Sequence, residues 1–441
     1  MQRPSTSIDS IIISNPKLYT DSQSSQESRI FPYYAGYSSE FSQNILSSLS
    51  LKPNSVIFDP WNGSGTTTRS AINNGYCAIG FDLNPAMVVV AKARLLSHLE
   101  FPSLISLAKA LVEQAKTCVT LHEKIENDPL LTWLSPSSAF WIRALEQRIN
   151  YVLICNEKYR KLNSNEAMDK LSPLAAFFYV ALFRTVRRLL QDFVPSNPTW
   201  VKSPKSKLHR KRPIKDTIFN IYLEEVQKFI AKERYPDCPP NESEVNLRLQ
   251  IGNAENINLD NNSVDAIISS PPYCTRIDYA VSTAIELSIL GYKKSEFESL
   301  RRSLTGTSTV EKAVGSIDSK WGSTCVDFME NLYSHPSRAS KGYYFKNHLQ
   351  YFNSLSNSLR EISRVLKQDG LCFLVAQDSY YKEIHNDVPT IAAEMANQFG
   401  LQLVRRADFN TSRSMVGLNL KSKKYISSRR TTESVLCFIN C

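Results

Sequence analysis

The fold is decided by one stretch of sequence, Phe58-Asp59-Pro60-Trp61-Asn62-Gly63-Ser64-Gly65-Thr66-Thr67. It continues the short apolar run 56–58, which is typical of a parallel strand covered by helices on both faces. The glycines at 63 and 65 permit a tight turn and let main-chain N–H groups approach a ligand. Thr66 and Thr67 are natural helix caps. The stretch predicts a strand, a turn and a helix in succession. The turn is either a ligand-binding turn or only a tight connection between the strand and the helix.

A second strand that ends in an acid follows one helix later. Residues 77–81 read as a buried strand, and Asp82 comes directly after it. An acid at this position can accept hydrogen bonds from the hydroxyls of a ribose. NAD-binding folds share this arrangement but use Gly-x-Gly-x-x-Gly, whereas the pattern here stops after two glycines. The two segments therefore suit a different nucleotide-like cofactor.

The rest of the chain continues the alternation of strands and helices. Further strands are expected at 266–268, 371–375, 401–407 and 434–439, and helices at 66–74, 86–96, 355–366 and 390–399. Such alternation is typical of a doubly wound α/β fold, with helices on both faces of a largely parallel sheet. Residues 97–244 interrupt it with mostly helical patterns, which predicts a large helical insertion.

We expect four segments along the chain. Residues 1–29 are rich in Ser and Gln and are expected to form a mobile N-terminal arm. Residues 30–96 form the first half of the sheet domain with the cofactor site. Residues 97–244 form the insertion, and 245–441 form the second half of the sheet domain with the catalytic motif.

A second motif, Ser270-Pro271-Pro272-Tyr273, ends the strand at 266–268. Together with the first stretch it resembles the DNA amino-methyltransferases, which transfer a methyl group from S-adenosylmethionine (SAM) to an exocyclic base nitrogen. The resemblance implies a Rossmann-like SAM methyltransferase sheet that ends in an antiparallel pair of strands. It covers residues 30–96 and 245–441 and does not extend to the insertion.

The Pro-Pro turn suits this chemistry because an exocyclic amine is a poor nucleophile, its lone pair being delocalised into the ring. Hydrogen-bond acceptors aimed at the amine hydrogens favour the transition state over the ground state. Ser270 offers a hydroxyl, Pro271 a carbonyl held by the Pro-Pro geometry, and Tyr273 a face for a base that has left the helix. Taken alone, Pro-Pro can also be a simple end to a strand. The predicted catalytic residues are Ser270, Pro271, Pro272 and Tyr273.

The resemblance also bears on the target base. Ser-Pro-Pro-Tyr usually accompanies cytosine N4 methylation, whereas Asp-Pro-Pro-Tyr or Asn-Pro-Pro-Tyr usually accompanies adenine N6 methylation. Cytosine C5 enzymes need a Pro-Cys nucleophile, and the sequence has no Pro-Cys dipeptide. The cofactor motif precedes the catalytic motif here, an order seen more often in adenine enzymes. We therefore expect a site-specific cytosine-N4 methyltransferase of the restriction-modification type, with adenine N6 as the alternative.

The cofactor residues follow from the same resemblance. Tyr37 belongs to an element that covers the methionine end of SAM, and a polar residue after the third strand contacts the adenine ring. The expected SAM-binding residues are Tyr37, Asp59, Pro60, Gly63, Gly65, Thr66, Thr67, Asp82, Asn253 and Glu255.

The net charge of +10 suggests a polyanionic partner, and the resemblance implies that this partner is double-stranded DNA. Residues 202–215 are rich in Lys and Arg and contain no acid, which is typical of a phosphate-facing segment and also of a solvated surface. Arg184, Arg187 and Arg188 precede this segment at helical spacing. The predicted DNA-binding residues are Lys202, Lys205, Lys207, Arg210, Lys211, Arg212 and, beside the catalytic motif, Arg276.

Other features limit the remaining classes of protein. The nine cysteines include no Cys-x-x-Cys pair, so we expect reduced thiols in the cytoplasm and no metal site. The first ten residues lack the apolar core of a signal peptide, and the longest apolar run, 174–183, is too short to cross a bilayer. Two other functions stay open: an RNA guanine-N2 methyltransferase and a DNA-binding protein with an inactive methyltransferase fold. The recognition sequence and the oligomeric state are not predicted.

Overall fold

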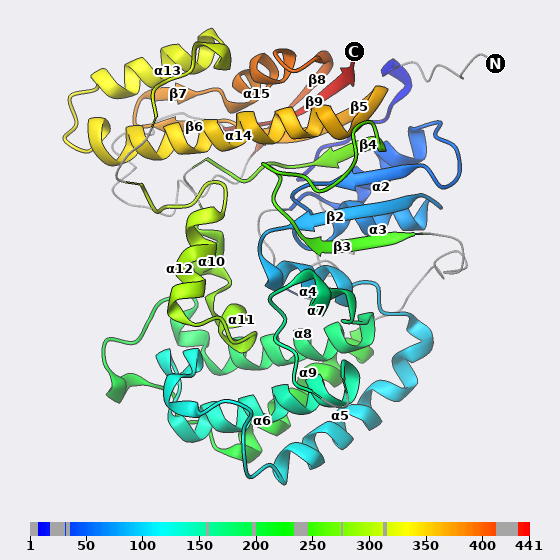
Figure 1. Ribbon diagram of the computed structural model, residues 1–441, viewed down its shortest axis with the longest axis vertical. Helices are drawn as coiled ribbons and strands as arrows, with labels where there is room; N and C mark the ends of the chain where they lie inside the picture. The colour runs from blue at the N-terminus through cyan, green and yellow to red at the C-terminus, as the bar shows by residue number, and fades with distance from the viewer. Residues whose placement is uncertain are drawn as a thin grey trace.

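The computed structural model describes residues 8–17, 31, 36–155, 158–195, 200–232, 246–274, 277–311, 315–411 and 431–441. At its centre is a seven-stranded sheet in the order β3-β2-β1-β4-β5-β9-β8 (Figure 1). The strands are β1 Val56–Asp59, β2 Cys77–Asp82, β3 Leu247–Ile251, β4 Val264–Ser269, β5 Leu366–Gln377, β8 Leu401–Thr411 and β9 Thr431–Asn440.

The strand directions confirm the predicted fold class. The pairs from β3 to β5 are all parallel, whereas β9 runs antiparallel to both β5 and β8. The carboxyl ends of β1, β2 and β4 therefore meet at one edge of the sheet, where open α/β sheets place their ligands.

Helices cover both faces of the sheet. The helices α2 Ser39–Ser48 and α3 Thr66–Asn73 pack on one face, and α13 Ser323–Ser334, α14 Phe345–Val365 and α15 Val388–Asn397 pack on the other. Successive residues of a strand point to opposite faces of the sheet: Ile267 of β4 packs in the core under α14, and Ile268 packs in the core under α2. This is why the strands read as continuous apolar runs.

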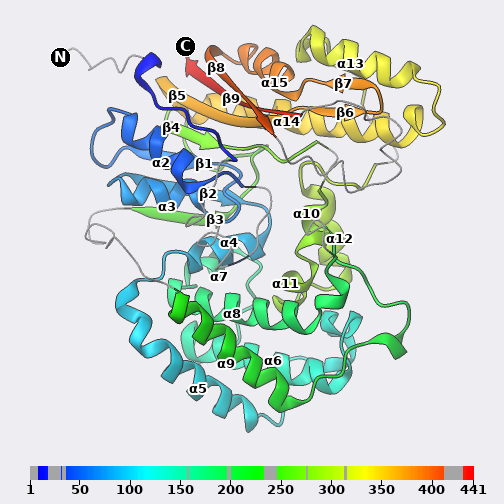
Figure 2. The ribbon, with the colours of Figure 1, turned by 180° about the vertical axis from the view of Figure 1, so that it is seen from behind.

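The helical insertion forms a separate layer beyond the β3 edge, seen at the bottom of Figures 1 and 2. Serine side chains cap two of its helices: Ser135 accepts from the main chain of Ser138, and Ser172 from that of Ala175. In both helices Pro occupies the first turn, where its missing N–H costs nothing. The helices that follow β2 are α4 Pro85–Ala93, α5 Phe101–Lys116, α6 Pro136–Leu153, α7 Asn165–Asp169, α8 Pro173–Leu189 and α9 Lys215–Lys232.

The segment that follows β4 links the insertion to the sheet. It contains α10 Tyr279–Ser282, α11 Ala284–Ile289 and α12 Lys294–Ser303. Arg187 of α8 pairs with the fully buried Glu286 of α11 and donates to the Ser282 carbonyl at 2.6 Å. Arg143 of α6 donates to the carbonyls of Ser288 and Ile289 at 3.0 and 2.6 Å. Two insertion arginines thus hold the chain that leaves the Pro-Pro turn.

Short elements complete the described chain. A hairpin of β6 Ser379–Tyr381 and β7 Ile384–Asn386 follows β5. The short helices are η1 Ile8–Ser10, η2 His98–Glu100, η3 Ile125–Asn127, η4 Pro129–Thr132, η5 Gln191–Phe193, η6 Lys207–His209, η7 Ser319–Trp321 and the π-helix η8 Ser340–Tyr344.

The N-terminal segment differs from the expected mobile arm over 1–29. Residues 8–17 lie against the sheet, because Ile11 joins the core under α2 with only 2% of its surface exposed. Arg405 of β8 donates to the carbonyls of Ile8 and Ile11 at 3.1 and 2.8 Å. A few apolar residues in an otherwise polar stretch are enough to anchor it.

Membrane spans and metal sites are two further features that the described residues bear on. Among the described residues, no individual helix combines the length and apolar composition of a membrane span. The helices at 85–93 and 98–116 reach that length and composition only when taken together, and they are bent by 78° where they meet. No group of three His, Cys, Asp or Glu side chains suited to a metal occurs among those same residues.

Candidate active site

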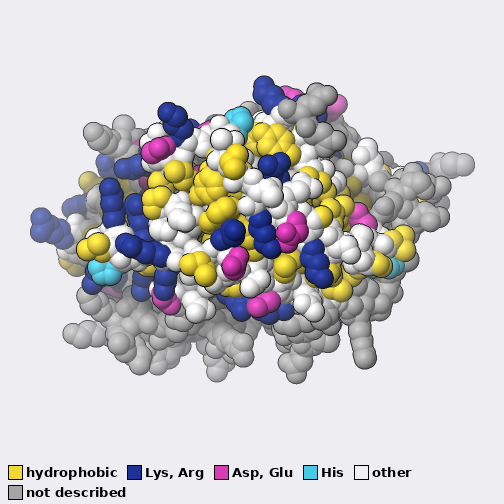
Figure 3. All heavy atoms as spheres, turned by 90° about the horizontal axis from the view of Figure 1, so that it is seen from below, with side chains coloured by type: hydrophobic (Ala, Val, Ile, Leu, Met, Phe, Trp, Pro, Cys, Tyr) yellow, Lys and Arg dark blue, Asp and Glu magenta, His cyan; other side chains and the backbone are white. Residues whose placement is uncertain are grey.

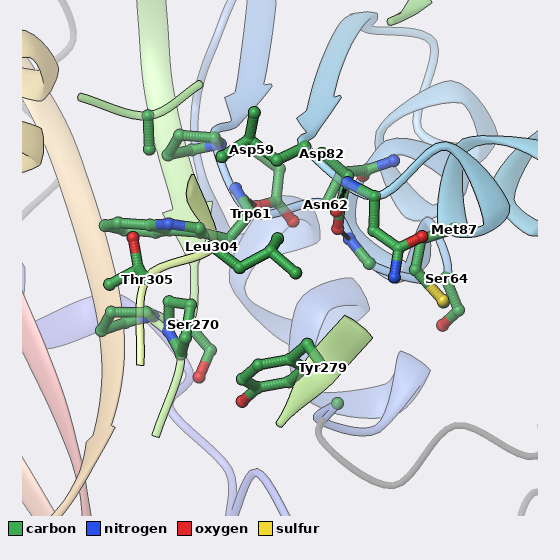
Figure 4. Close-up of a pocket in the computed structure, with 18 of the residues that line it drawn as sticks. Asp59, Trp61, Asn62, Ser64, Asp82, Met87, Ser270, Tyr279, Leu304 and Thr305 are labelled. Atoms are coloured by element: carbon green, nitrogen blue, oxygen red, sulfur yellow. Dashed lines mark hydrogen bonds between the residues drawn. The ribbon is translucent and has the colours of Figure 1, made fainter. Parts of the chain in front are cut away.

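A pocket lies at the carboxyl ends of β1, β2 and β4 and contains about 890 Å³ of empty space, its open side included (Figure 4). Both sequence motifs contribute to its lining, although about two hundred residues separate them.

The glycine turn and the acid of β2 hold each other in place. The Gly63 N–H donates to Asp82 Oδ2 at 2.9 Å, and the Asn84 N–H donates to Asp82 Oδ1 at 2.8 Å. Each carboxylate oxygen keeps a further lone pair for a ligand hydroxyl. Burial raises the pKa of Asp82 to about 7. The two main-chain hydrogen bonds therefore only partly stabilise the charged Asp82 carboxylate. Hydrogen bonds donated by a ligand would stabilise it further.

Gly65 has a different role from the one predicted. It begins α3 with φ of +84°, in the left-handed region, and a Cβ atom there would lie 2.9 Å from the Ala91 Cβ atom of α4. Gly65 does not line the pocket. The packing of α3 against α4 is enough to require glycine at this position.

Asp59 is the centre of a buried network beneath the pocket. Its Oδ1 accepts from the Ser269 hydroxyl at 2.5 Å and from the Trp61 N–H at 3.1 Å. The Tyr37 hydroxyl lies 3.4 Å from Asp59 Oδ2 and contacts the Thr67 hydroxyl, which donates to the Ile268 carbonyl at 3.0 Å. Burial raises the pKa of Asp59 to about 6. The network joins β1, the start of α3 and the end of β4.

The expected cofactor residues divide into two groups. Tyr37, Asp59, Pro60, Gly63, Thr66, Asp82 and Asn253 line the pocket; Gly65, Thr67 and Glu255 do not. Glu255 instead accepts from the Asn357 amide of α14 at 3.3 Å.

The Pro-Pro turn follows β4 directly. The Ser270 hydroxyl donates to the Val375 carbonyl of β5 at 2.8 Å, and the Tyr351 hydroxyl donates to the Pro272 carbonyl at 2.9 Å. Since the hydroxyl hydrogen of Ser270 is already used, this oxygen can only accept from a ligand in the pocket. Ser270, Pro271 and Pro272 line the pocket.

Tyr273 lies outside the pocket lining. It is half-buried, the Lys17 ammonium group lies 5.6 Å from its ring centroid, and its N–H donates to the Tyr279 hydroxyl at 3.1 Å. The aromatic residues that do line the pocket are Tyr37, Trp61 and Tyr279.

The sequence analysis missed one wall of the pocket. Leu304 and Thr305, in the loop after α12, face the cavity (Figure 4). Gly306 has φ of +78°, and a Cβ atom there would lie 2.7 Å from the Tyr273 carbonyl oxygen. The only local signal is this glycine in Leu304-Thr305-Gly306-Thr307, which reads as an ordinary loop.

Comparisons with known proteins bear on the same motifs. The N6_N4_Mtase family model, described as DNA methylase, matches residues 15–93. The Type II methyltransferase M.BsoBI from Geobacillus stearothermophilus is 24% identical over 349 residues, which is 72% of this chain and 63% of that protein. M.MvaI from Kocuria varians is 25% identical over 369 residues, 78% of this chain and 75% of that protein.

These matches support the resemblance of the chain to the DNA amino-methyltransferases.

Other similarities are shorter or weaker. M.AvaI from Nostoc sp., another Type II methyltransferase, is 27% identical over 150 residues, which is 32% of this chain and 31% of that protein. The chain thus spans 63% of the M.BsoBI length and 31% of the M.AvaI length. Among solved structures, the YcgJ protein from Bacillus subtilis matches with a TM-score of 0.31 and 10% identity over 91% of this chain and 98% of that chain.

The resemblance to DNA methyltransferases implies SAM as the methyl donor. The pocket fits that cofactor in its donor and acceptor groups: a buried carboxylate in Asp82, a glycine turn at Gly63, and the polar side chain of Asn253 beyond β3.

The predicted DNA-binding loop lies between α8 and α9 and projects from the left edge of the molecule in Figure 1. Both of its ends are fixed: Trp133 Nε1 donates to the Lys202 carbonyl at 2.8 Å, and the Lys211 N–H donates to the Trp133 carbonyl at 2.8 Å. Lys202, Lys205, Lys207 and Arg212 are exposed. The view from below shows Lys and Arg side chains gathered on this side of the molecule (Figure 3).

Several basic residues that the sequence placed near the DNA are paired with acidic side chains of the protein. Arg187 pairs with Glu286, Arg184 with Glu225, and Arg188 with Glu224 and Glu225. These arginines hold helices together, because acids on α9 and α11 face them. Lys211 pairs with Asp192. The position predicted beside the catalytic motif, Arg276, lies outside the described residues.

Proposed function

We propose that this protein transfers a methyl group from SAM to an exocyclic amine of a DNA base, N4 of cytosine, within a specific sequence. One observation carries the proposal: the Ser270 hydroxyl, restricted to accepting by its bond to Val375, lines the same pocket as Asp82 and the glycine turn. Double-stranded DNA is the proposed partner, with the loop at 202–212 along its phosphates.

The proposed chemistry needs no covalent intermediate. When bound, SAM supplies an activated methyl group. The Ser270 oxygen and the Pro271 carbonyl accept hydrogen bonds from the two amine hydrogens and return the lone pair to nitrogen. Tyr351 supports this arrangement because its bond to the Pro272 carbonyl fixes the turn.

The cofactor would be held by residues on the other side of the pocket. Asp82 would accept from the ribose hydroxyls, the turn at Gly63 would allow a close approach of the cofactor, and Asn253 would contact the adenine ring. Tyr37 would cover the methionine end, since its hydroxyl is held in the Asp59 network.

We assign cytosine rather than adenine as the target base because position 270 is Ser, which usually accompanies cytosine N4 methylation in the enzymes that this chain resembles. A hydroxyl is a smaller acceptor than the Asn or Asp side chain usual in adenine enzymes. The order of the two motifs is the specific observation that favours adenine N6 as the second candidate.

The direct test is incubation of DNA with isotope-labelled SAM, followed by mass spectrometry of the nucleosides. N4-methylcytosine is the expected product. Methyladenine alone would overturn the cytosine assignment and leave amine methylation standing. No labelled base, in DNA of diverse sequence, would overturn the proposed function.

A further inference from the structure

We propose that Tyr279 reads the target base by donating its phenol hydrogen to the ring nitrogen next to the exocyclic amine. The inference rests on the proposed function and deepens it. Tyr279 lies on α10, six residues beyond Tyr273, and no sequence motif marks it.

The hydrogen bond already made by Tyr279 decides its remaining role. Its oxygen accepts the Tyr273 N–H at 3.1 Å. A phenol has one hydrogen to donate, and that hydrogen stays available because the bond to Tyr273 uses an oxygen lone pair. Tyr279 therefore faces the pocket as a donor, whereas Ser270 faces it as an acceptor. Figure 4 shows both residues on the same side of the pocket.

The helix that carries Tyr279 is held firmly. Asp278, its N-cap, is 5% exposed and accepts from Arg301 Nε at 2.8 Å and from the Ser308 hydroxyl at 2.5 Å. Thr283 accepts from the Asn84 amide of the cofactor wall at 2.8 Å. Such support keeps a side chain close to one productive geometry.

A donor beside an acceptor matches one kind of base edge. Cytosine presents its N4 amine beside the N3 acceptor, and adenine presents its N6 amine beside the N1 acceptor. The keto edges of thymine and of guanine at O6 present the opposite pattern. Enzymes that act on flipped bases read the Watson–Crick edge in this way, and a site built for such bonds rejects bases that leave them unmade. Tyr279 and Ser270 together therefore select an amine-bearing edge.

The test is a double-mutant cycle between protein and base. The substrate is an unmethylated duplex that contains the site that the wild type methylates. It carries either the natural target base or a deaza analogue in which a C–H group replaces the ring nitrogen, namely 3-deazacytosine or 1-deazaadenine. The kcat/KM for methylation is measured for the wild type and Tyr279→Phe on both duplexes. Tyr333→Phe, an exposed tyrosine on α13, is the matched control.

We expect the deaza base to lower the wild-type kcat/KM roughly tenfold, the scale of one hydrogen bond. In Tyr279→Phe the same change of base should have little further effect. The loss of the Tyr273 N–H bond in Tyr279→Phe affects both duplexes equally, so it cancels in the cycle. SAM affinity, measured by calorimetry, should be unchanged.

Two results would overturn this inference alone: additive losses in the cycle, or a drop in SAM affinity in Tyr279→Phe that explains the loss of activity. A wild type that methylates no DNA would overturn the proposed function and this inference with it.

Discussion

At the scale of single residues, the site contains side chains whose hydrogen-bonding roles are fixed by burial and by the bonds that they already make. Asp82 accepts two main-chain hydrogen bonds, yet burial still raises its pKa to about 7. The Ser270 oxygen is limited to accepting because its hydrogen goes to Val375. Both side chains can therefore accept hydrogen bonds from a ligand in the pocket.

Asp82→Ala should weaken SAM binding by about 1–3 kcal/mol, the scale of a lost charge-assisted hydrogen bond. Calorimetry of the variant measures this directly. Gly65 lies outside the pocket, so its replacement is expected to act through stability. Unchanged affinity in Asp82→Ala would remove Asp82 from the cofactor site.

SAM binding should also depend on pH through Asp82. Its pKa in the free protein, about 7, lies above the ordinary value of 3.8, so its contribution to folding stability is lost as the pH rises from about 4 through 7. Ligand hydroxyls favour the charged carboxylate and have the opposite effect. SAM affinity should therefore rise roughly tenfold from pH 6 to pH 8.

Asp82→Asn is the control for this pH dependence, because it keeps the shape of the side chain and removes the titration. Its affinity should vary only with the ionisation of SAM itself and, near pH 6, with that of Asp59, whose pKa burial raises to about 6. The same slope in both proteins would show that another group titrates.

At the scale of elements, the turn between β1 and α3 and the end of β4 were predictable because each is a short apolar run followed by strong local signals. The wall formed by Leu304 and Thr305 was not predictable. Those residues reach the pocket because Gly306 packs against Tyr273, and Tyr343 of η8 donates to the Ser308 carbonyl at 2.9 Å. Contacts between residues so far apart leave no periodic trace in a sequence.

The basic residues show the same limit. Composition identified the segment 202–215 and also Arg184, Arg187 and Arg188, but only the structure separates exposed cations from paired ones. The arginines of α8 face acids of α9 and α11, which a single helix pattern cannot indicate.

The loop between α8 and α9 should carry much of the DNA affinity. Changing Lys202, Lys205, Lys207 and Arg212 to Ala should weaken binding to every DNA sequence, and it should flatten the slope of log K against log salt by up to about 4, since each phosphate contact adds about 0.9. Fluorescence anisotropy across a range of salt concentrations measures both effects.

The charge-matched control replaces four exposed lysines elsewhere, Lys52, Lys109, Lys124 and Lys158. It has the same net charge as the loop variant but keeps the loop. Equal slopes in the two variants would show that net charge alone, and not this loop, determines DNA binding.

At the scale of the whole molecule, a buried ion pair joins the helical insertion to the segment that follows β4. Arg187 pairs with Glu286, which is fully buried. Arg187→Ala should lower the free energy of unfolding by about 3–5 kcal/mol, because it leaves a buried carboxylate unpaired. Urea unfolding followed by circular dichroism measures this loss.

Arg188→Ala is the comparison, since Arg188 pairs mainly with the exposed Glu224 at the surface. Its loss should be no more than about 1 kcal/mol. Equal losses in the two variants would contradict the role given to the Arg187–Glu286 pair in holding the insertion to the chain beyond the Pro-Pro turn.

The central claim is that the turn at Ser270 performs base methylation in the SAM pocket, and the most direct measurement is the methyl-transfer rate of the Ser270→Ala, Tyr273→Ala variant at saturating SAM. The variant should bind SAM like the wild type, because its changes lie outside the glycine turn and Asp82. Ser270→Ala alone should lose only part of the rate, since Pro271 keeps its carbonyl. Tyr273 lies outside the pocket lining, so its replacement tests the predicted stacking of the extruded base on this ring, a contact typically worth about 1–3 kcal/mol. Single-turnover transfer to DNA should therefore fall by at least roughly tenfold in the double variant. Transfer at the full wild-type rate would contradict the mechanism.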